Sequence, residues 1–207
     1  MYTNYYQNKV IDRDFRAQSW TPPSTWYLAL LTCSRGGRVS STLYTSGDTM
    51  AVLANDGVLH LYACTTTGTS ASSQGGLYPG VDAEVITDGA AGFTEQSTAL
   101  RAGTYAEAAY TGYARPGIVA SLANFAGTQS SGSTSASSGT SGTTSNNGAV
   151  NFGAPTSGPT DIWAEAWFDA SSSGNMLMVN PLAFAQTIYS GNGAPSLAAG
   201  ATTVTFK

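Results

Sequence analysis

Charged residues are scarce in this chain. Asp, Glu, Lys and Arg together make up 10% of its 207 residues, whereas roughly 25% is usual for a globular protein. The formal net charge is −4, and the 8 basic residues are scattered without a cluster. Because nucleic-acid binding depends on basic patches that neutralise phosphates, the composition argues against direct contact with DNA or RNA. We expect a surface covered by hydroxyls, amides and other protein chains.

Long apolar runs are also lacking. The longest, Trp26 to Leu31, falls far short of the roughly 18 residues that a membrane-spanning helix needs. The first residues, Met1 to Gln7, lack the apolar core of a signal peptide. We therefore expect no membrane partner and assembly within a cytoplasm. In such a compartment the 2 cysteines, Cys33 and Cys64, are predicted to be free thiols.

Patterns that support catalysis or metal binding are missing from the sequence. The single histidine, His60, lies in a predicted strand and has no orienting partner nearby in the sequence. No Ser or Cys stands in a nucleophile-elbow motif, and no glycine-rich phosphate loop is present. The spacing of Cys33 and Cys64 does not match a zinc pattern. We predict that the protein is not an enzyme and that it has no catalytic residues, no metal site and no cofactor.

The N-terminal segment favours a helix from Tyr5 to about Arg16. Asn4 is the predicted N-cap, and the prolines at 22 and 23 forbid continuation. Such a helix packs on its own sheet or reaches a neighbouring subunit, because terminal segments reorganise easily on binding. Four apolar or aromatic residues that recur at helical spacing are candidate partner contacts: Tyr5, Tyr6, Ile11 and Phe15.

Short strands are predicted after the prolines. Asn55-Asp56-Gly57 separates two runs of strand-forming residues, 50–54 and 58–63, which is a strong hairpin signal. Many short strands between Gly, Asn, Ser and Pro turns are typical of a sandwich or barrel. Further strands are predicted at 26–32, 82–87, 104–113, 117–125, 149–153, 161–169, 175–180, 184–189 and 201–206.

Several short sequence blocks occur in a fixed order. They are Asn8–Asp12, Thr21–Trp26, Gly112–Arg115, Trp167–Ala170 with Gly174–Leu177, and Ala198–Phe206 at the end. In this order they resemble a family of small virion proteins of tailed bacteriophages, often labelled tail-fibre proteins. The resemblance covers residues 8–32, 107–126 and 146–207. It implies a structural part of a virus particle rather than an enzyme, and an antiparallel jelly-roll-like β-sandwich. Together with the helix and hairpin signals, we predict an all-β fold: such a sandwich with a short N-terminal helix and an inserted β-hairpin region.

Two stretches depart from that family pattern. Residues 33–104 form an insertion far longer than an ordinary loop, which must be ordered by its own strands. Residues 127–148 are almost entirely Ser, Gly and Thr, and this composition predicts a flexible loop or an arm held against another subunit. We predict one domain over 1–207, with a helical arm at 1–20.

One strand carries the sharpest binding hypothesis. If residues 161–169 are extended, a period of two places Trp163, Glu165 and Trp167 on one face. Indoles and carboxylates together suit stacking on sugar rings and binding of their hydroxyls. The alternative is that both indoles fill a subunit interface or cap the edge of the sandwich, and interface base rates favour this alternative.

The resemblance favours a capsid decoration or cement protein that binds the major capsid protein on the outer surface of the virion. We expect self-association, as a trimer rather than a dimer, because closed symmetric oligomers suit repeated lattice sites. The alternative is a tail-fibre or receptor-binding module that recognises host carbohydrate through Trp163, Glu165 and Trp167.

Overall fold

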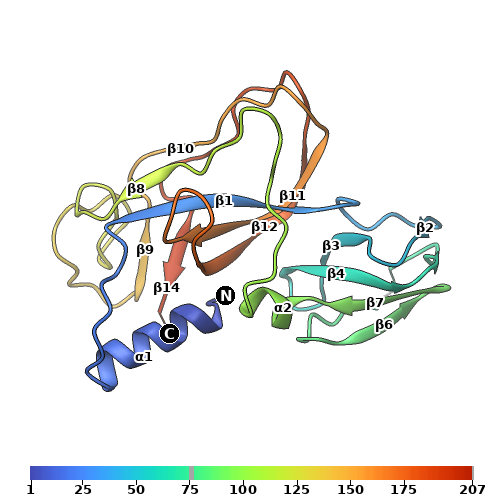
Figure 1. Cartoon of the computed structure of the whole chain (residues 1–207), viewed down its shortest axis with the longest axis horizontal. Coiled ribbons are helices and arrows are strands. Elements are labelled where there is room, and N and C mark those ends of the chain that lie inside the picture. The colour runs from blue at the N-terminus through green and yellow to red at the C-terminus, as the bar shows by residue number, and fades with distance from the viewer. Residues whose placement is uncertain (75–76, 207) are drawn as a thin grey trace.

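The computed structural model describes residues 1–74 and 77–206. Two four-stranded antiparallel sheets lie beside each other, and three two-stranded pairs and two helices complete the fold (Figure 1). In this described part of the chain none of the sheets closes into a barrel. The predicted class, an antiparallel all-β fold with a short N-terminal helix, is confirmed.

The first sheet has the order β12-β11-β1-β8. Its strands are β1 (Thr25–Cys33), β8 (Gly117–Val119), β11 (Thr160–Phe168) and β12 (Met176–Ile188). The central strand β1 is buried on both faces: Leu28 and Leu30 pack into one apolar cluster, while Ala29 and Leu31 pack into another. Burial on both sides explains why β1 is a continuous apolar run rather than an alternating one.

The second sheet lies in the insertion and has the order β3-β4-β7-β6. Its strands are β3 (Thr49–Leu53), β4 (Leu59–Thr66), β6 (Val85–Asp88) and β7 (Ala91–Glu95). The predicted hairpin is confirmed, since β3 pairs with β4 across a turn in which Gly57 has a φ of +80°. Leu59 and Leu61 of this sheet share a buried cluster with β1, β11 and β12, so the two sheets pack on each other.

The remaining strands form short pairs. Strand β2 (Leu43–Tyr44) pairs with β5 (Gly68–Thr69), β10 (Val150–Asn151) with β13 (Ser196–Leu197), and β9 (Thr143–Ser145) with β14 (Thr203–Thr205).

In the middle of the chain one predicted strand is absent and one short helix was not predicted. Residues 104–113 do not form a strand. Two backbone hydrogen bonds join this segment to β1: the Thr32 N–H donates to the Ala106 carbonyl at 2.9 Å, and the Ala108 N–H donates to the Leu30 carbonyl at 2.9 Å. The segment then turns at Gly112. A five-residue helix, α2 (Ser97–Arg101), was not predicted, because it is too short to show a helical period.

Helix α1 (Asn4–Phe15) lies against the first sheet near both chain ends (Figure 1). Its N-cap is Thr3 and not Asn4 as predicted: the Thr3 hydroxyl accepts a hydrogen bond from the Tyr6 N–H at 3.3 Å. Residues 1–3 run along the edge of β12, where the Thr3 N–H donates to the Leu177 carbonyl at 3.0 Å. The helix has Tyr6 as its buried residue and leaves most of its surface to solvent.

The Ser/Gly/Thr-rich loop, residues 127–148, folds back on itself. Gln129 donates to Ser135 at 2.9 Å, and the Ser141 hydroxyl donates to the Thr128 carbonyl at 2.7 Å. The prediction of a flexible loop is wrong at 143–145, which form β9 and pair with β14. Small hydroxyl side chains make this possible because they satisfy backbone groups locally.

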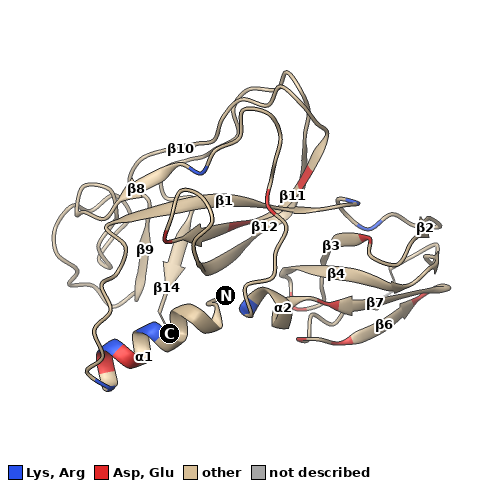
Figure 2. Ribbon diagram, in the orientation of Figure 1, with Lys and Arg blue, Asp and Glu red and all other residues tan. Residues whose placement is uncertain are grey.

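Charges are unevenly distributed over the fold. Figure 2 shows acidic and basic residues together on α1, whereas the loop around β9 carries none. Helix α1 holds its charges in local pairs, Arg16 with Asp12 at 2.7 Å and Arg13 with Asp14 at 2.6 Å. The helices in the described residues are all too short or too polar to cross a membrane.

Candidate functional site

The predicted binding strand is β11, and a bulge changes which way its side chains face. The register against both neighbouring strands shifts between Ile162 and Ala164. Trp163 therefore packs into the cluster between the two sheets, whereas Trp167 packs into the cluster beneath α1. The prediction that Trp163 and Trp167 share one face is wrong, because an extra residue in a strand interrupts the period of two.

Both indoles are also inside the molecule. Trp163 is 2% exposed and Trp167 is 1% exposed. A sugar ring needs an open aromatic face for stacking, so neither side chain offers a carbohydrate platform in this conformation. Because both indoles are buried within a single chain, they do not fill a subunit interface either.

Glu165 is buried as well, at 4% exposed. Its Oε1 atom accepts hydrogen bonds from Asn180 Nδ2 at 2.9 Å and from the Thr202 hydroxyl. Its Oε2 atom has no partner among the described residues. Burial raises the pKa of this carboxyl, against the opposing effect of its two donors. Glu165 thus ties β11 to β12 and to the segment before β14 rather than facing a ligand from solvent.

Asn146 is a buried residue that the sequence did not single out. Its Oδ1 accepts the Thr202 N–H at 3.0 Å, and its Nδ2 donates to the carbonyls of Gly148 and Ala198, both at 2.8 Å. With Glu165 it fixes the C-terminal segment on the sheet. Nothing in the sequence marked it, because Asn146 follows a long run of Ser, Gly and Thr.

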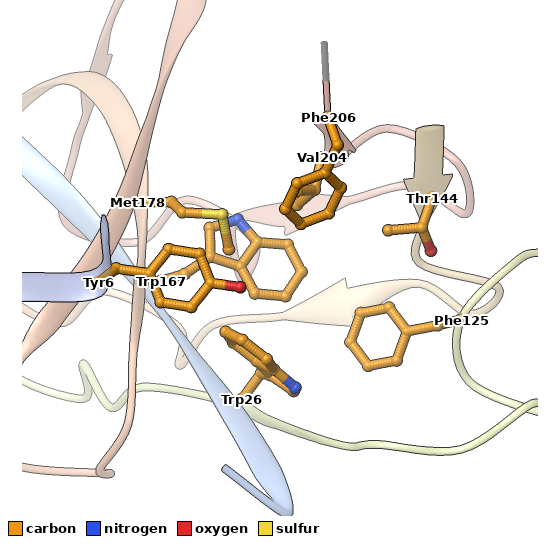
Figure 3. Close-up of a pocket in the computed structure, with 8 residues that line it drawn as sticks. All are labelled: Tyr6, Trp26, Phe125, Thr144, Trp167, Met178, Val204 and Phe206. Atoms are coloured by element: carbon orange, nitrogen blue, oxygen red, sulfur yellow. The ribbon is translucent and has the colours of Figure 1, made fainter. Parts of the chain in front are cut away.

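An aromatic pocket lies between α1, β14 and the first sheet (Figure 3). Its volume is about 180 Å³. Trp26 meets Trp167 edge-on at 6.0 Å between ring centroids, and Phe125 lies 5.9 Å from Trp167. The lining residues are Tyr6, Trp26, Phe125, Thr144, Trp167, Met178, Val204 and Phe206.

A second apolar hollow shares Tyr6 and Phe206 with the aromatic pocket and continues along α1 to Val10 and Ile11. Its volume is about 260 Å³, and Tyr2 stacks on Phe206 at 5.6 Å across one wall. Such apolar walls suit the binding of apolar side chains. They offer few polar groups for a sugar or a charged ligand, because specificity for such ligands requires placed hydrogen-bonding groups.

The helical candidates differ in exposure. Tyr6 is buried, Tyr5 is half-buried beneath the Lys9 ammonium at 5.6 Å, and Ile11 is 48% exposed. Phe15 is 82% exposed at the outer end of the helix. Ile11 and Phe15 thus remain available for contact with a partner.

Two of the sequence blocks that carried the family resemblance, Gly112–Arg115 and Trp167–Ala170, meet at one buried arginine. The Arg115 guanidinium lies 3.6 Å from the centre of the Phe168 ring and pairs with Glu107 at 2.8 Å. It also donates to the carbonyls of Ala170 and Ser173 at 3.1 and 2.7 Å. A planar guanidinium with five donors suits this combination of stacking and several acceptors.

Two glycines of these blocks lie at positions where a residue with a side chain would not fit. Gly112 has a φ of +99°, and a Cβ there would overlap the Ala154 carbonyl. Gly174 has a φ of +71°, and a Cβ there would meet the Asp169 carboxylate, which accepts the Asn175 N–H at 2.7 Å. The contacts of Arg115 with Glu107, Phe168, Ala170 and Ser173, named here the Arg115 lock, thus connect two of the ordered blocks at the end of β11.

His60 has two acidic partners that the sequence did not reveal. Its Nδ1 lies 3.0 Å from Glu95, and its Nε2 lies 3.0 Å from Asp56 in the hairpin turn. The hydrogen bond to Glu95 is the main cause that raises the pKa of His60. Glu95 also accepts the Ser97 N–H at 2.9 Å, so this cluster links the hairpin to α2. Within residues 1–74 and 77–206, no three His, Cys, Asp or Glu side chains are grouped to hold a metal.

The two cysteines are free, as predicted, and both are buried. Burial raises the pKa of the Cys33 thiol to about 11. A thiol in this state is a poor nucleophile.

The protein is thus built mainly of β-strands, and residues of the motif blocks hold neighbouring segments together through hydrogen bonds. The family model described as Podophage GP4 fiber I protein gp80 matches residues 87–205, more than half of the chain. The chain belongs to this family, and the predicted resemblance to phage tail-fibre-type virion proteins is confirmed. The protein is therefore a virion structural protein. No curated protein matches the chain.

The matched region includes the Arg115 lock, β11, β12 and the C-terminal strand. Helix α1, strand β1 and most of the second sheet lie outside it. The match also covers residues 87–104 of the predicted insertion and the loop at 127–148, and it leaves out residues 8–32, on which the resemblance also rested.

Proposed function

We propose that the protein is a non-catalytic structural subunit of the phage fibre apparatus, which acts by binding other virion proteins. The family match over residues 87–205 carries this proposal, because the family is described as a fibre protein. The burial of Trp163, Glu165 and Trp167 adds support, since it leaves the alternative of glycan recognition without its candidate residues.

Protein partners suit the exposed surface better than sugars do. The two hollows beside α1 are lined by apolar and aromatic side chains, and Ile11 and Phe15 extend this apolar surface outward. Clustered exposed apolar groups are typical of surfaces that another protein covers. A neighbouring virion protein, or a second copy of the chain, is the proposed partner.

Capsid decoration is the second candidate. It is supported by the scarcity of charge, 10% of residues, and by an uncharged loop at 127–148, both of which suit a surface that lies against a shell protein. Many copies that each make a modest contact with the major capsid protein can stabilise a lattice together. In this arrangement the protein lies on the outer surface of the capsid.

Labelling of intact particles tests both positions. Antibody raised against the isolated protein is detected by electron microscopy, and the copy number is measured from stained gels of purified virions. Label at fibres with a few tens of copies or fewer supports the fibre proposal. Label spread over the shell, with hundreds of copies, supports decoration instead, and absence from purified particles contradicts both.

A further inference from the structure

The outer edges of the two four-stranded sheets are treated differently. An open edge presents unpaired backbone N–H and C=O groups, so natural proteins cover or blunt such edges to prevent pairing with another chain. Four strands lie at these edges: β12 and β8 in the first sheet, β3 and β6 in the second.

Each edge of the first sheet is protected over part of its length. Residues 1–3 cover β12, with the Thr3 N–H bonded to the Leu177 carbonyl at 3.0 Å and the Val179 N–H bonded to the Met1 carbonyl at 2.8 Å. At β8, Asn124 Nδ2 occupies the Val119 carbonyl at 2.9 Å.

In the second sheet β3 is protected too. Residues 35–37 run beside it, with the Ala51 N–H donating to the Gly36 carbonyl at 2.8 Å and the Arg35 N–H donating to the Thr49 carbonyl at 3.0 Å. The Gln74 amide covers the Leu53 carbonyl at 3.0 Å. Along β6, in contrast, no described residue pairs with the edge that faces away from β7.

The hydrogen-bond pattern identifies which groups of β6 are unpaired. The Glu95 N–H donates to the Glu84 carbonyl at 2.9 Å, and Ile86 lies opposite Phe93 two residues further on. In an antiparallel ladder the residues between such hydrogen-bonded pairs point their N–H and C=O groups the other way. Val85 and Thr87 therefore present their backbone groups outward.

The side chains at this edge do not protect it. Val85 is 75% exposed, and Thr87 is exposed beside it. The two flanking carboxylates point inward instead of guarding the edge. Glu84 accepts from Tyr62 and from the Gly80 N–H at 3.2 Å, and Asp88 pairs with Arg38 at 2.7 Å.

We propose that β6 is a strand-addition site at which β6 of a second copy pairs in antiparallel orientation. A two-fold axis through Ile86 places Val85 opposite Thr87 of the other copy, so both outward residues of each chain find a partner. The outward N–H and C=O groups then form four hydrogen bonds and none remains unused. Glu84 falls opposite Asp88 of the other copy, but Asp88 is already neutralised by Arg38 within its own chain.

This arrangement joins the two second sheets into one sheet of eight strands. The self-complementary spacing of the outward residues argues for a second copy, because a two-fold interface uses the same surface on both chains. The contact is independent of the proposed fibre or capsid position, and it adds a two-fold step to whatever unit the chain otherwise forms.

Two substitutions test the edge directly. Val85→Lys places a charge on the edge, and Thr87→Pro removes an outward N–H without affecting a bond to β7. Val81→Lys is the matched control, because Val81 is 60% exposed but lies outside β6. Sedimentation velocity over a range of concentrations measures the assembly mass, and circular dichroism checks that each variant is folded.

We expect both edge variants to halve the assembly mass, or to raise the dissociation constant at least tenfold, while Val81→Lys behaves as the wild type. An Ile86→Cys variant should form a disulfide-linked dimer on mild oxidation, because Ile86 faces Ile86 of the other copy in a non-hydrogen-bonded pair, where opposite side chains lie closest. Unchanged assembly in folded edge variants, a wild type that stays monomeric at high concentration, or failure of the cysteine variant to cross-link would each overturn the proposal.

Discussion

At the scale of single residues, Trp167 illustrates how the core of the first sheet is built. It is among the largest fully buried side chains and contacts the rings of Trp26 and Phe125. We expect Trp167→Ala to lower the free energy of unfolding by about 3 kcal/mol, within the usual cost of truncating a large buried aromatic. Urea denaturation followed by circular dichroism measures this change.

Trp20→Ala is the matched control, because Trp20 is only partly buried and touches Tyr6 from the end of the helical arm. It should cost clearly less than Trp167→Ala. If Trp167→Ala keeps wild-type stability but abolishes attachment to host cells, Trp167 belongs to a receptor site and the packing explanation is wrong.

Glu165 predicts a dependence of stability on pH. Burial raises the pKa of its carboxyl, so the folded chain binds this proton more tightly than the unfolded chain does. The contribution of this group to stability is complete below its unfolded pKa of about 4.3, and it is lost as pH rises through the folded-state value. We expect Glu165→Gln to be more stable than the wild type at pH 7.5 and about equal to it at pH 4.

Urea unfolding at the two pH values measures this difference. Asp12→Asn, which removes a carboxylate from the surface of α1, should give no comparable gain at pH 7.5. A Glu165→Gln variant that is less stable than the wild type at pH 7.5 would show that the ionised carboxylate is favourable in the folded state.

At the scale of elements, the Ser/Gly/Thr-rich loop has two parts with different roles. Residues 130–140 contact mainly their own loop, whereas 143–145 pair with β14. Replacing 130–140 with a four-residue turn should change stability by no more than about 1 kcal/mol, because closure entropy depends weakly on loop length.

A second variant, in which the four-residue turn replaces residues 130–145, serves as the comparison. It removes the partner of β14 and should cost substantially more in thermal unfolding experiments. Equal stability of the two variants would mean that the pairing of β9 with β14 contributes nothing. A shortened protein that folds but no longer joins the particle would identify residues 130–140 as a contact arm.

Elements with strong local signals could be predicted from the sequence. The Asp-Gly turn defined the β3–β4 hairpin, and the prolines at 22 and 23 separated helix α1 from strand β1. Strand β7 was missed because Ala91 and Gly92 give it little strand propensity, and its Phe93 is buried only through tertiary packing.

The candidate site could be predicted only in part, for the same reason. The order of the motif blocks identified the family, but the meeting of two of them at Arg115 is a tertiary property. The bulge at Trp163 is invisible to a period of two, and it decides that Trp163 and Trp167 face opposite clusters. Asn146 carries no local signal because its partners, Ala198 and Thr202, are more than fifty residues away.

At the scale of the whole molecule, the inserted sheet and the first sheet share one buried cluster. Leu59 and Leu61 of β4 pack there with Leu31 and Trp163. A unit that contributes its own apolar face to a common core cannot unfold without exposing the face of its neighbour. The predicted single domain over 1–207 therefore implies that both sheets unfold together.

Differential scanning calorimetry tests this cooperativity. We expect one transition whose calorimetric and van't Hoff enthalpies agree. Leu61→Ala should lower the free energy of unfolding by about 2–5 kcal/mol and so move that transition to lower temperature. The control is Leu53→Ala at the outer end of β3, where the side chain is 54% exposed, and its transition should stay close to that of the wild type. Two separate transitions, with Leu61→Ala shifting only one of them, would show that the insertion is a domain of its own. In that case the first sheet would owe little of its stability to the second sheet.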